Sequence, residues 1–114
     1  MKWELLPYGK CDAVFDRGAF EAIEVFDRPA YVTQILTFIK PQFRYILNGF
    51  EYEDPKFFGP PRPINFSQLS DYFKDYSVEI ISKEDYSQQG KVDFGVLNGM
   101  TDIHYLIKPL NCEN

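Results

Sequence analysis

Short apolar runs of strand type, separated by helix patterns and prolines, constrain the fold of this chain most. Residues 11–16 (CDAVFD) form an apolar run with acidic ends, which is typical of a strand buried on both faces. Residues 43–52 (FRYILNGFEY) are the strongest strand candidate because they are rich in aromatic and β-branched residues. Residues 77–82 (SVEIIS) and 103–108 (IHYLIK) predict two further strands. The sequence therefore predicts four strands.

A helix is expected between the first two strands. It begins near Asp27, a residue type that caps helices, with Pro29 in its first turn. An apolar stripe at i, i+3, i+4 and i+7 then faces a sheet, and it consists of Val32, Ile35, Leu36 and Ile39. Pro41 ends the helix, because proline disfavours helical backbone in the residue before it.

The remaining segments complete the order β-α-β-α-β-β. A second helix is expected over residues 66–75, opened by Asn65 or Ser67, and the polar residues 83–92 predict a connection without a helix. Strands separated by helices pair in parallel through right-handed crossovers. The last two strands should pair antiparallel. We therefore predict one α/β domain over residues 1–114, with a mostly parallel sheet, an antiparallel terminal hairpin and helices on its faces.

The first strand has the composition of a central strand, although it lies near the start of the chain. Left at the border of a sheet, it would expose unpaired backbone groups and apolar side chains, which invite association. We expect a partner chain, a second copy in a homodimer or an additional amino-terminal segment to cover it.

Composition excludes several classes of function. The chain has 114 residues, is 45% hydrophobic and carries a net charge of −5. Without clustered Lys and Arg, no nucleic-acid partner is expected. No apolar stretch approaches the roughly 20 residues that span a bilayer, so no membrane association is expected. Two distant cysteines and one histidine, His104, give no metal-ligand spacing, and a reducing, cytoplasmic location is expected.

One set of motifs follows the first two strands. It consists of Asp16, Arg17, Gly18 and Ala19 after the first strand, Tyr52 at the end of the second, and Gly59, Pro60 and Pro61 after that. In these motifs the chain resembles the thiopurine S-methyltransferase family of class I methyltransferases. The resemblance runs from about Gly9 to the last strand and corresponds to the carboxyl-terminal half of a family member, with half of its Rossmann-like sheet.

The resemblance implies methyl transfer from the cofactor S-adenosylmethionine to a sulfur atom of a small-molecule thiol or a thiopurine-like acceptor. Such an in-line displacement depends on holding donor and acceptor collinear in a dry pocket, and it needs no metal.

Arg17 is the residue through which the resemblance implies cofactor contact. It lies at the carboxyl end of its strand, where open α/β sheets bind ligands. The residues alone favour a surface arginine paired with Asp16 or Glu21. Asp16 has two equally supported roles, which are orienting Arg17 and capping the following turn.

Residues 53–64 carry four prolines and predict an irregular loop. By resemblance this loop covers the pocket, with Phe57 and Phe58 on its underside, while an ordinary proline-rich connector is the alternative. Arg62 departs from the family, which often has an aromatic residue there. The substrate-side residues implied by the resemblance are Asp16, Tyr52, Gly59, Pro60, Pro61, Arg62 and Lys91.

The glycine-rich turn that seats the cofactor in class I methyltransferases has no counterpart, since the seven glycines never form a G-x-G. The chain alone is therefore expected to bind S-adenosylmethionine poorly and to be a truncated, inactive form. Two alternatives are a binding or regulatory module that docks its first strand on a partner, and an edge-paired homodimer with a structural role.

Overall fold

The computed structural model describes residues 11–54, 56–57 and 59–110. Their elements, in chain order, are β1 (Cys11–Arg17), α1 (Ala19–Ala22), the 3-10 turn η2 (Val25–Asp27), α2 (Arg28–Thr37), β2 (Ile39–Tyr52), α3 (Phe66–Tyr72), β3 (Tyr76–Asp85), α4 (Ser87–Phe94) and β4 (Met100–Pro109).

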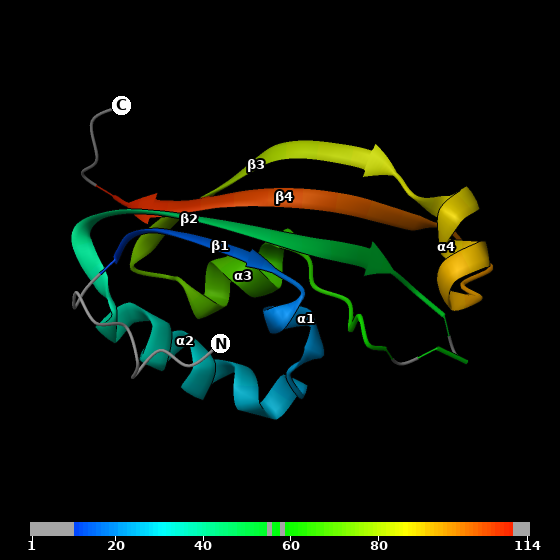
Figure 1. The fold of residues 1–114 in the computed structure, drawn as a ribbon, viewed down its shortest axis with the longest axis horizontal. Helices are drawn as coiled ribbons and strands as arrows, with labels where there is room; N and C mark the ends of the chain where they lie inside the picture. Colours follow the sequence, from blue (N-terminus) through cyan, green and yellow to red (C-terminus); the bar gives the residue numbers. More distant parts are fainter. Residues whose placement is uncertain (1–10, 55, 58, 111–114) are drawn as a thin grey trace.

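The four strands form one sheet in the order β1-β2-β4-β3. β1 pairs with β2 in parallel, and β4 pairs antiparallel with both β2 and β3. Three strands therefore point one way and β4 runs in reverse between two of them (Figure 1). The mixed α/β sheet and the antiparallel closing pair confirm the prediction from the sequence.

Helices α1, α2 and α3 all lie on one side of this sheet (Figure 1). The main core lies between them and the strands, and its fully buried members include Phe20, Ile35, Tyr45, Leu69 and Tyr105. The expectation that helices cover the faces is met only in part in the described residues, since the other face meets a helix only where Phe94 of α4 packs on Phe50. The connections β1 to β2 and β2 to β3 advance in the same direction across the sheet. Because such connections are right-handed, their helices fall on the same face.

The other face of the sheet is open beside β1 in the described part of the chain, while its end at Phe50 packs against Tyr86 and Phe94. Phe15, Ile46 and Leu106 are direct cross-strand neighbours on it, and Phe15 is 56% exposed. β1 forms an edge and pairs only with β2 among the described strands. Val14 and Asp16 are buried, whereas Phe15 and Arg17 are exposed. The predicted burial of β1 on both faces is therefore met on the helical face alone.

Two segments differ from the sequence expectation near prolines and polar residues. Helix α2 ends at Thr37 and β2 begins at Ile39, so Ile39 belongs to the strand and not to the helical stripe. Pro41 lies inside β2, where the pairing with β1 shifts register between Cys11 and Ala13. A proline lacks the N–H that a regular ladder requires, so the irregularity accommodates it.

The expected polar connection over residues 83–92 instead contains the end of β3 and helix α4. Asp85 Oδ1 accepts a 2.9 Å hydrogen bond from the Ser87 backbone N–H at the start of α4. Gly95, with φ 71°, takes the left-handed conformation that ends the helix. Only Gly90 of α4 is buried, so the segment lacks the apolar stripe that predicts a helix.

Replacing Gly49 with alanine should destabilise the fold. A Cβ at this β2 position would overlap the Ile64 Cγ2 atom. Overpacking of this kind costs about 1–3 kcal/mol. Urea unfolding of Gly49→Ala should show this loss, while Ser67→Ala, at an exposed position of α3, should change stability by less than about 0.5 kcal/mol. An unchanged Gly49→Ala would contradict the close approach of Ile64 to β2.

Candidate functional site

Asp16 organises the carboxyl end of β1. Its side chain is buried, and Oδ1 accepts the Phe20 backbone N–H at 3.1 Å. Oδ2 accepts the hydroxyl hydrogens of Tyr31 at 2.9 Å and Tyr45 at 2.6 Å. Of the two roles expected for Asp16, the structure shows capping of the turn. Asp16 points to the helical face and Arg17 to the open face, as adjacent strand residues do.

The buried tyrosines around Asp16 remain hydrogen-bond donors. Burial, followed by the negative charge of Asp16, raises the pKa of Tyr31 and raises the pKa of Tyr45 well above its usual value. Asp16 therefore joins β1 to α1, α2 and β2 through neutral hydroxyls and one backbone N–H.

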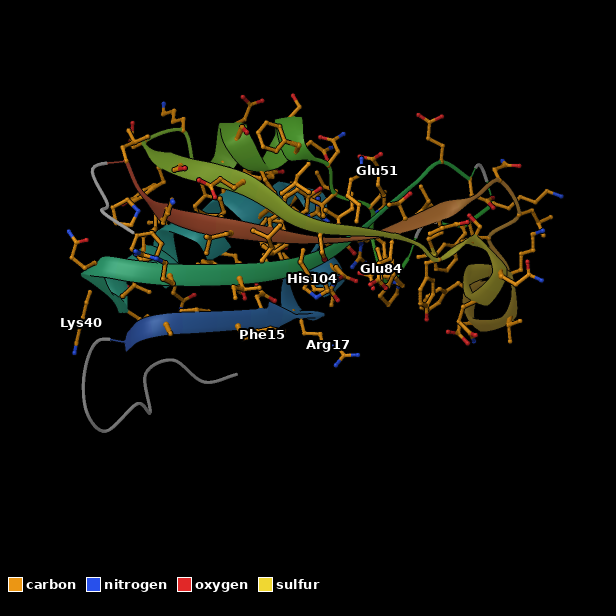
Figure 2. The ribbon with its side chains drawn as sticks, turned by 90° about the horizontal axis from the view of Figure 1, so that it is seen from above. Phe15, Arg17, Lys40, Glu51, Glu84 and His104 are labelled. Carbon is orange, nitrogen blue, oxygen red and sulfur yellow. The ribbon has the colours of Figure 1, made fainter. Side chains whose placement is uncertain are left out.

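A cavity of about 280 Å³ lies where the parallel strands β1 and β2 end. We call it the Arg17 cavity. Its lining residues are Arg17, Gly18, Glu21, Asn48, Phe50, Tyr86 and Asp102. Gly18 has φ 102°, a conformation that favours glycine, and it turns the chain from β1 into α1. Figure 2 shows Arg17 at the end of β1, pointing away from the sheet.

Two polar groups of this cavity are fixed by each other. The Asn48 amide donates hydrogen bonds to Asp102 Oδ1 and, at 3.2 Å, to the Ile103 carbonyl oxygen. Phe50 and Asp102 are cross-strand neighbours, so the apolar ring lies beside the carboxylate. His104, on the same face, lies 3.1 Å from Ser82 Oγ through Nδ1, as expected for a packed strand residue.

Glu21 is the most perturbed acid of the Arg17 cavity. It is 4% exposed. Burial, followed by the negative charges of Asp16 and Asp102, raises its pKa from 4.5 to about 7, and Arg28 opposes the shift. Perturbed carboxyls in concave sites are typical of functional groups.

The 59–63 segment is held against α1 rather than standing over the cavity. Tyr52 donates a 2.6 Å hydrogen bond to the Pro61 carbonyl oxygen, and the Arg62 backbone N–H donates to the Glu21 carbonyl oxygen at 2.9 Å. The Arg62 guanidinium donates to the Ala22 carbonyl oxygen and pairs with Glu24 at 2.7 Å. The charge of Arg62 is therefore engaged by Glu24.

Buried Arg28 supports the same segment. Its Nη1 donates to the Pro63 carbonyl oxygen at 3.3 Å, and its guanidinium carbon lies 5.0 Å from the centre of the Phe20 ring. Burial lowers the pKa of Arg28.

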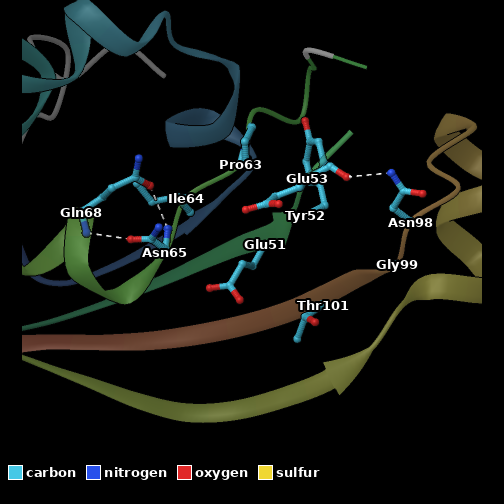
Figure 3. A pocket seen from close by; sticks show the side chains of 10 residues that line it. All are labelled: Glu51, Tyr52, Glu53, Pro63, Ile64, Asn65, Gln68, Asn98, Gly99 and Thr101. Carbon is cyan, nitrogen blue, oxygen red and sulfur yellow. Dashed lines mark hydrogen bonds between the residues drawn. The ribbon is translucent and has the colours of Figure 1, made fainter. Parts of the chain in front are cut away.

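Two other cavities flank the end of β2. One of about 420 Å³, the Arg62 cavity, is lined by Glu24, Val25, Tyr52, Glu53, Asp54, Phe57, Arg62 and Pro63. The larger, about 630 Å³, lies on the helical face beside Glu51 and the start of α3 (Figure 3). Its amides are already engaged, since Asn65 and Gln68 cap α3 reciprocally and Asn98 donates to the Glu53 carbonyl oxygen. We favour the Arg17 cavity because it combines the ends of two parallel strands with a perturbed acid.

Aromatic rings connect the Arg17 and Arg62 cavities. The ring centres of Phe50 and Phe94 lie 6.1 Å apart, those of Phe94 and Phe57 5.7 Å apart, and those of Phe57 and Tyr52 5.5 Å apart. A ring-shaped ligand would meet an apolar wall here.

The structure separates the residues expected from the sequence. Arg17 lines the Arg17 cavity, whereas Tyr52 and Arg62 line the Arg62 cavity and Pro61 accepts the Tyr52 hydrogen bond. Asp16 is buried, and Lys91 is exposed on α4. The three cavities described above are lined by none of Asp16, Gly59, Pro60 and Lys91. Phe58 lies outside the described residues.

Sequence reasoning did not identify Asn48, Phe50, Tyr86 or Asp102 as site residues, and it considered Glu21 only as an ion-pair partner of Arg17. One available signal was Asn48, a polar residue in an otherwise apolar run. In the described part of the chain no cluster of His, Cys, Asp and Glu has the arrangement of a metal site. No helix there is long and apolar enough to cross a membrane.

Solved methyltransferases share this fold. A putative type 11 methyltransferase from Sulfolobus solfataricus aligns with a TM-score of 0.59, covering 99% of this chain and 58% of its own at 14% identity. The 1,6-didemethyltoxoflavin-N1-methyltransferase of Burkholderia thailandensis, solved with 1,6-didemethyltoxoflavin and S-adenosylhomocysteine, aligns with a TM-score of 0.53 over 86% of this chain and 44% of its own, at 13% identity. The fold is that of class I methyltransferases.

The sequence model of the family thiopurine S-methyltransferase (TPMT) matches residues 2–108. The thiopurine S-methyltransferase of Bos taurus is 30% identical over 89 residues, covering 77% of this chain and 36% of the bovine protein. That of Mus spretus is 34% identical over 65 residues, covering 57% of this chain and 27% of its own. The chain belongs to the thiopurine S-methyltransferase family, and it spans about a third of the length of these curated relatives.

Replacing Asp16 with alanine should strongly destabilise the chain. The change removes the acceptor for the Phe20 N–H and for two buried hydroxyls. An unsatisfied buried donor costs about 1–3 kcal/mol each. Thermal unfolding of Asp16→Ala should therefore show a much larger loss than Asp71→Ala, at an exposed position of α3. Similar midpoints for the two variants would contradict the role of Asp16.

Replacing Glu21 with glutamine should change how stability depends on pH. The folded chain holds the Glu21 proton more tightly than the unfolded chain, so stability from the neutral carboxyl is full below about pH 4.5 and is lost as pH rises through about 7. The free energy of unfolding of Glu21→Gln should therefore rise relative to that of the parent as the pH increases from about 5 to about 8, by up to about 3 kcal/mol. Urea unfolding at both pH values measures this, with Glu84→Gln, exposed on β3, as control. An equal stability difference between Glu21→Gln and the parent at both pH values would exclude the raised pKa of Glu21.

Proposed function

We propose that this chain provides the acceptor side of an S-adenosylmethionine-dependent methyltransferase that acts on a small-molecule thiol. The observation that carries the proposal is the Arg17 cavity, located at the ends of the parallel strands of a methyltransferase fold. The family match supports methyl transfer in general, and the sulfur acceptor follows the description of that family.

The aromatic side of the cavity suits a ring-bearing acceptor. Phe50 and Tyr86 present apolar surface, and Arg17 presents a forked cation at the rim. A guanidinium favours an anionic sulfur or a carboxylate beside it. Arg17 is therefore the residue to which we assign contact with the substrate or with the carboxylate of the cofactor.

The described residues do not fit the cofactor by themselves. Apart from its own chain neighbours, nothing lies within 4 Å of the place that a Cβ would take at Gly18, so this turn forms no close cradle. A cavity of about 280 Å³ is also below the usual range of roughly 300–1,000 Å³ for ligand pockets, and the chain contains no G-x-G turn. We propose that residues 1–114 correspond to the carboxyl-terminal half of a methyltransferase domain. The nucleoside cradle is then supplied by polypeptide beyond this sequence, and the chain alone is inactive.

Binding of S-adenosylhomocysteine tests this proposal. Calorimetric titration of the chain alone should give weak binding, with a dissociation constant above about 1 mM, a loss of more than about 4 kcal/mol against a micromolar site. A chimera that places the preceding half of the bovine relative before Cys11 should bind the ligand and methylate benzenethiol. Tight binding by the isolated chain would refute the missing cradle. A chimera that binds the ligand but does not methylate thiols would refute the acceptor class.

Arg17 should matter for catalysis in that chimera. Removing one charge-assisted contact costs about 1.5–3 kcal/mol, so Arg17→Ala should lower kcat/KM for benzenethiol about 10- to 100-fold. Lys74→Ala, an exposed cation after α3, is the matched control and should leave kcat/KM within about twofold. Equal effects of the two variants would remove Arg17 from the site.

A binding module is the second candidate function, and one observation favours it. β1 forms a sheet edge with Phe15 exposed beside it, a surface that accepts strand addition or a second copy. Sedimentation measures this directly. If the chain self-associates through this surface, Phe15→Asp should yield monomer, whereas association that survives the change would exclude the open face as its site.

A further inference from the structure

Glu21 has an unpaired carboxyl in the Arg17 cavity. It is 4% exposed, and no hydrogen bond reaches its carboxyl from the part of the chain that the structure describes. Asp102, the other carboxyl of the cavity, accepts from Asn48. A carboxyl that lines a cavity and has no hydrogen-bond partner in the described chain is available to a group that enters the cavity.

The position of Glu21 is fixed by its backbone. Its carbonyl oxygen accepts the Arg62 N–H at 2.9 Å, and the preceding Gly18 turn places α1 directly after β1. The side chain therefore lines the same cavity as Arg17 and the Phe50 ring. A ligand seated on Phe50 would lie between a carboxyl and a guanidinium.

The charges around Glu21 come from every element packed against it. They are Asp16 and Arg17 of β1, Arg28 of α2, Arg62 of the 59–63 segment, Asp102 of β4, and the phenols of Tyr52 and Tyr86. Burial and the two aspartates favour the neutral carboxyl, and Arg28 favours the ionised one. The balance permits both protonation states near neutral pH.

We propose that Glu21 accepts the proton of a thiol bound in the Arg17 cavity. This inference rests on the proposed function and adds a residue to it. In the step, the S–H bond breaks and its electron pair stays on sulfur, while an O–H bond forms on the Glu21 carboxylate. The resulting thiolate is the nucleophilic form of sulfur, and it lies beside the Arg17 guanidinium. The carboxyl later returns its proton to water.

The acidities of the two groups suit this transfer. An ordinary glutamate, at about 4.3, is too weak a base for a thiol at about 8.5. With its pKa raised to about 7, Glu21 is closer to the thiol and still ionised in part of the molecules near neutral pH. Proton transfer is most effective when the base titrates near the working pH.

Binding of phenylmethanethiol to this chain tests the inference without any cofactor. The thiol can transfer its proton only to ionised Glu21, and this form is also the stronger hydrogen-bond acceptor. The ionised fraction rises from about one tenth at pH 6 to about nine tenths at pH 8. The affinity measured by calorimetry should therefore increase about tenfold over this range. The methylated thioether, which has no S–H, should show no increase.

Matched glutamine variants separate this role from a structural one. Glu21→Gln should abolish the increase with pH, whereas Glu84→Gln should retain it. Asp102→Asn provides a second test that keeps Glu21 in place. Loss of a negative neighbour lowers the Glu21 pKa and should move the midpoint of the increase to lower pH.

The outcomes distinguish this inference from the proposed function. A thiol affinity that is flat with pH in the parent, or a pH increase that persists in Glu21→Gln, would overturn the role of Glu21. Neither result would bear on cofactor binding or methyl transfer, which the chimera tests separately. Conversely, a chimera without methyl transfer would refute the proposed function even where the pH increase is present.

Discussion

The buried carboxylate of Asp16 is the interaction on which the rest of the structure depends. It accepts one backbone N–H from α1 and two hydroxyls, from α2 and β2, and so fixes four elements at one point. The buried side chain of Asp16 is tolerated inside because three donors replace its water. With Asp16 fixed to the interior, Arg17 is directed to the opposite face, and the Gly18 turn delivers Glu21 to the end of the strand. One side chain thereby sets the geometry of the candidate site without lining it.

The 59–63 segment extends the same arrangement. Its contacts with Glu21, Ala22 and Glu24 connect the loop after β2 to the turn after β1, which lie about 40 residues apart in sequence. Prolines lower the conformational freedom that such docking removes. The segment acts as a brace for α1 in this structure, and a movement of the loop would move the Glu21 backbone with it.

The sequence predicted those elements and residues that local patterns specify, and it missed those that depend on contacts between distant parts of the chain. Residues 43–52 and the Asp27 helix start carry dense local patterns, and the elements they predict are present. Helix α4 lacks an apolar stripe, and Ile39 satisfies both a helical stripe and a strand, so tertiary pairing with Cys11 decides its conformation. Arg17 was found through a local motif. Asn48 and Asp102 meet across 54 residues, and no local pattern reports such a pair.

The one-sided arrangement of helices explains why the candidate site is only half enclosed. Connections that advance in one direction put α1, α2 and α3 on a single face. The opposite face then carries Phe15, Ile46 and Leu106 in register, followed at the next cross-strand row by Arg17 and Asn48. A segment or partner that covered this apolar row would lie next to Arg17, at the rim of the cavity. Glu21 is already buried in this structure, whereas Arg17 is exposed, so exclusion of water from Arg17 is what a cover on the open face would add.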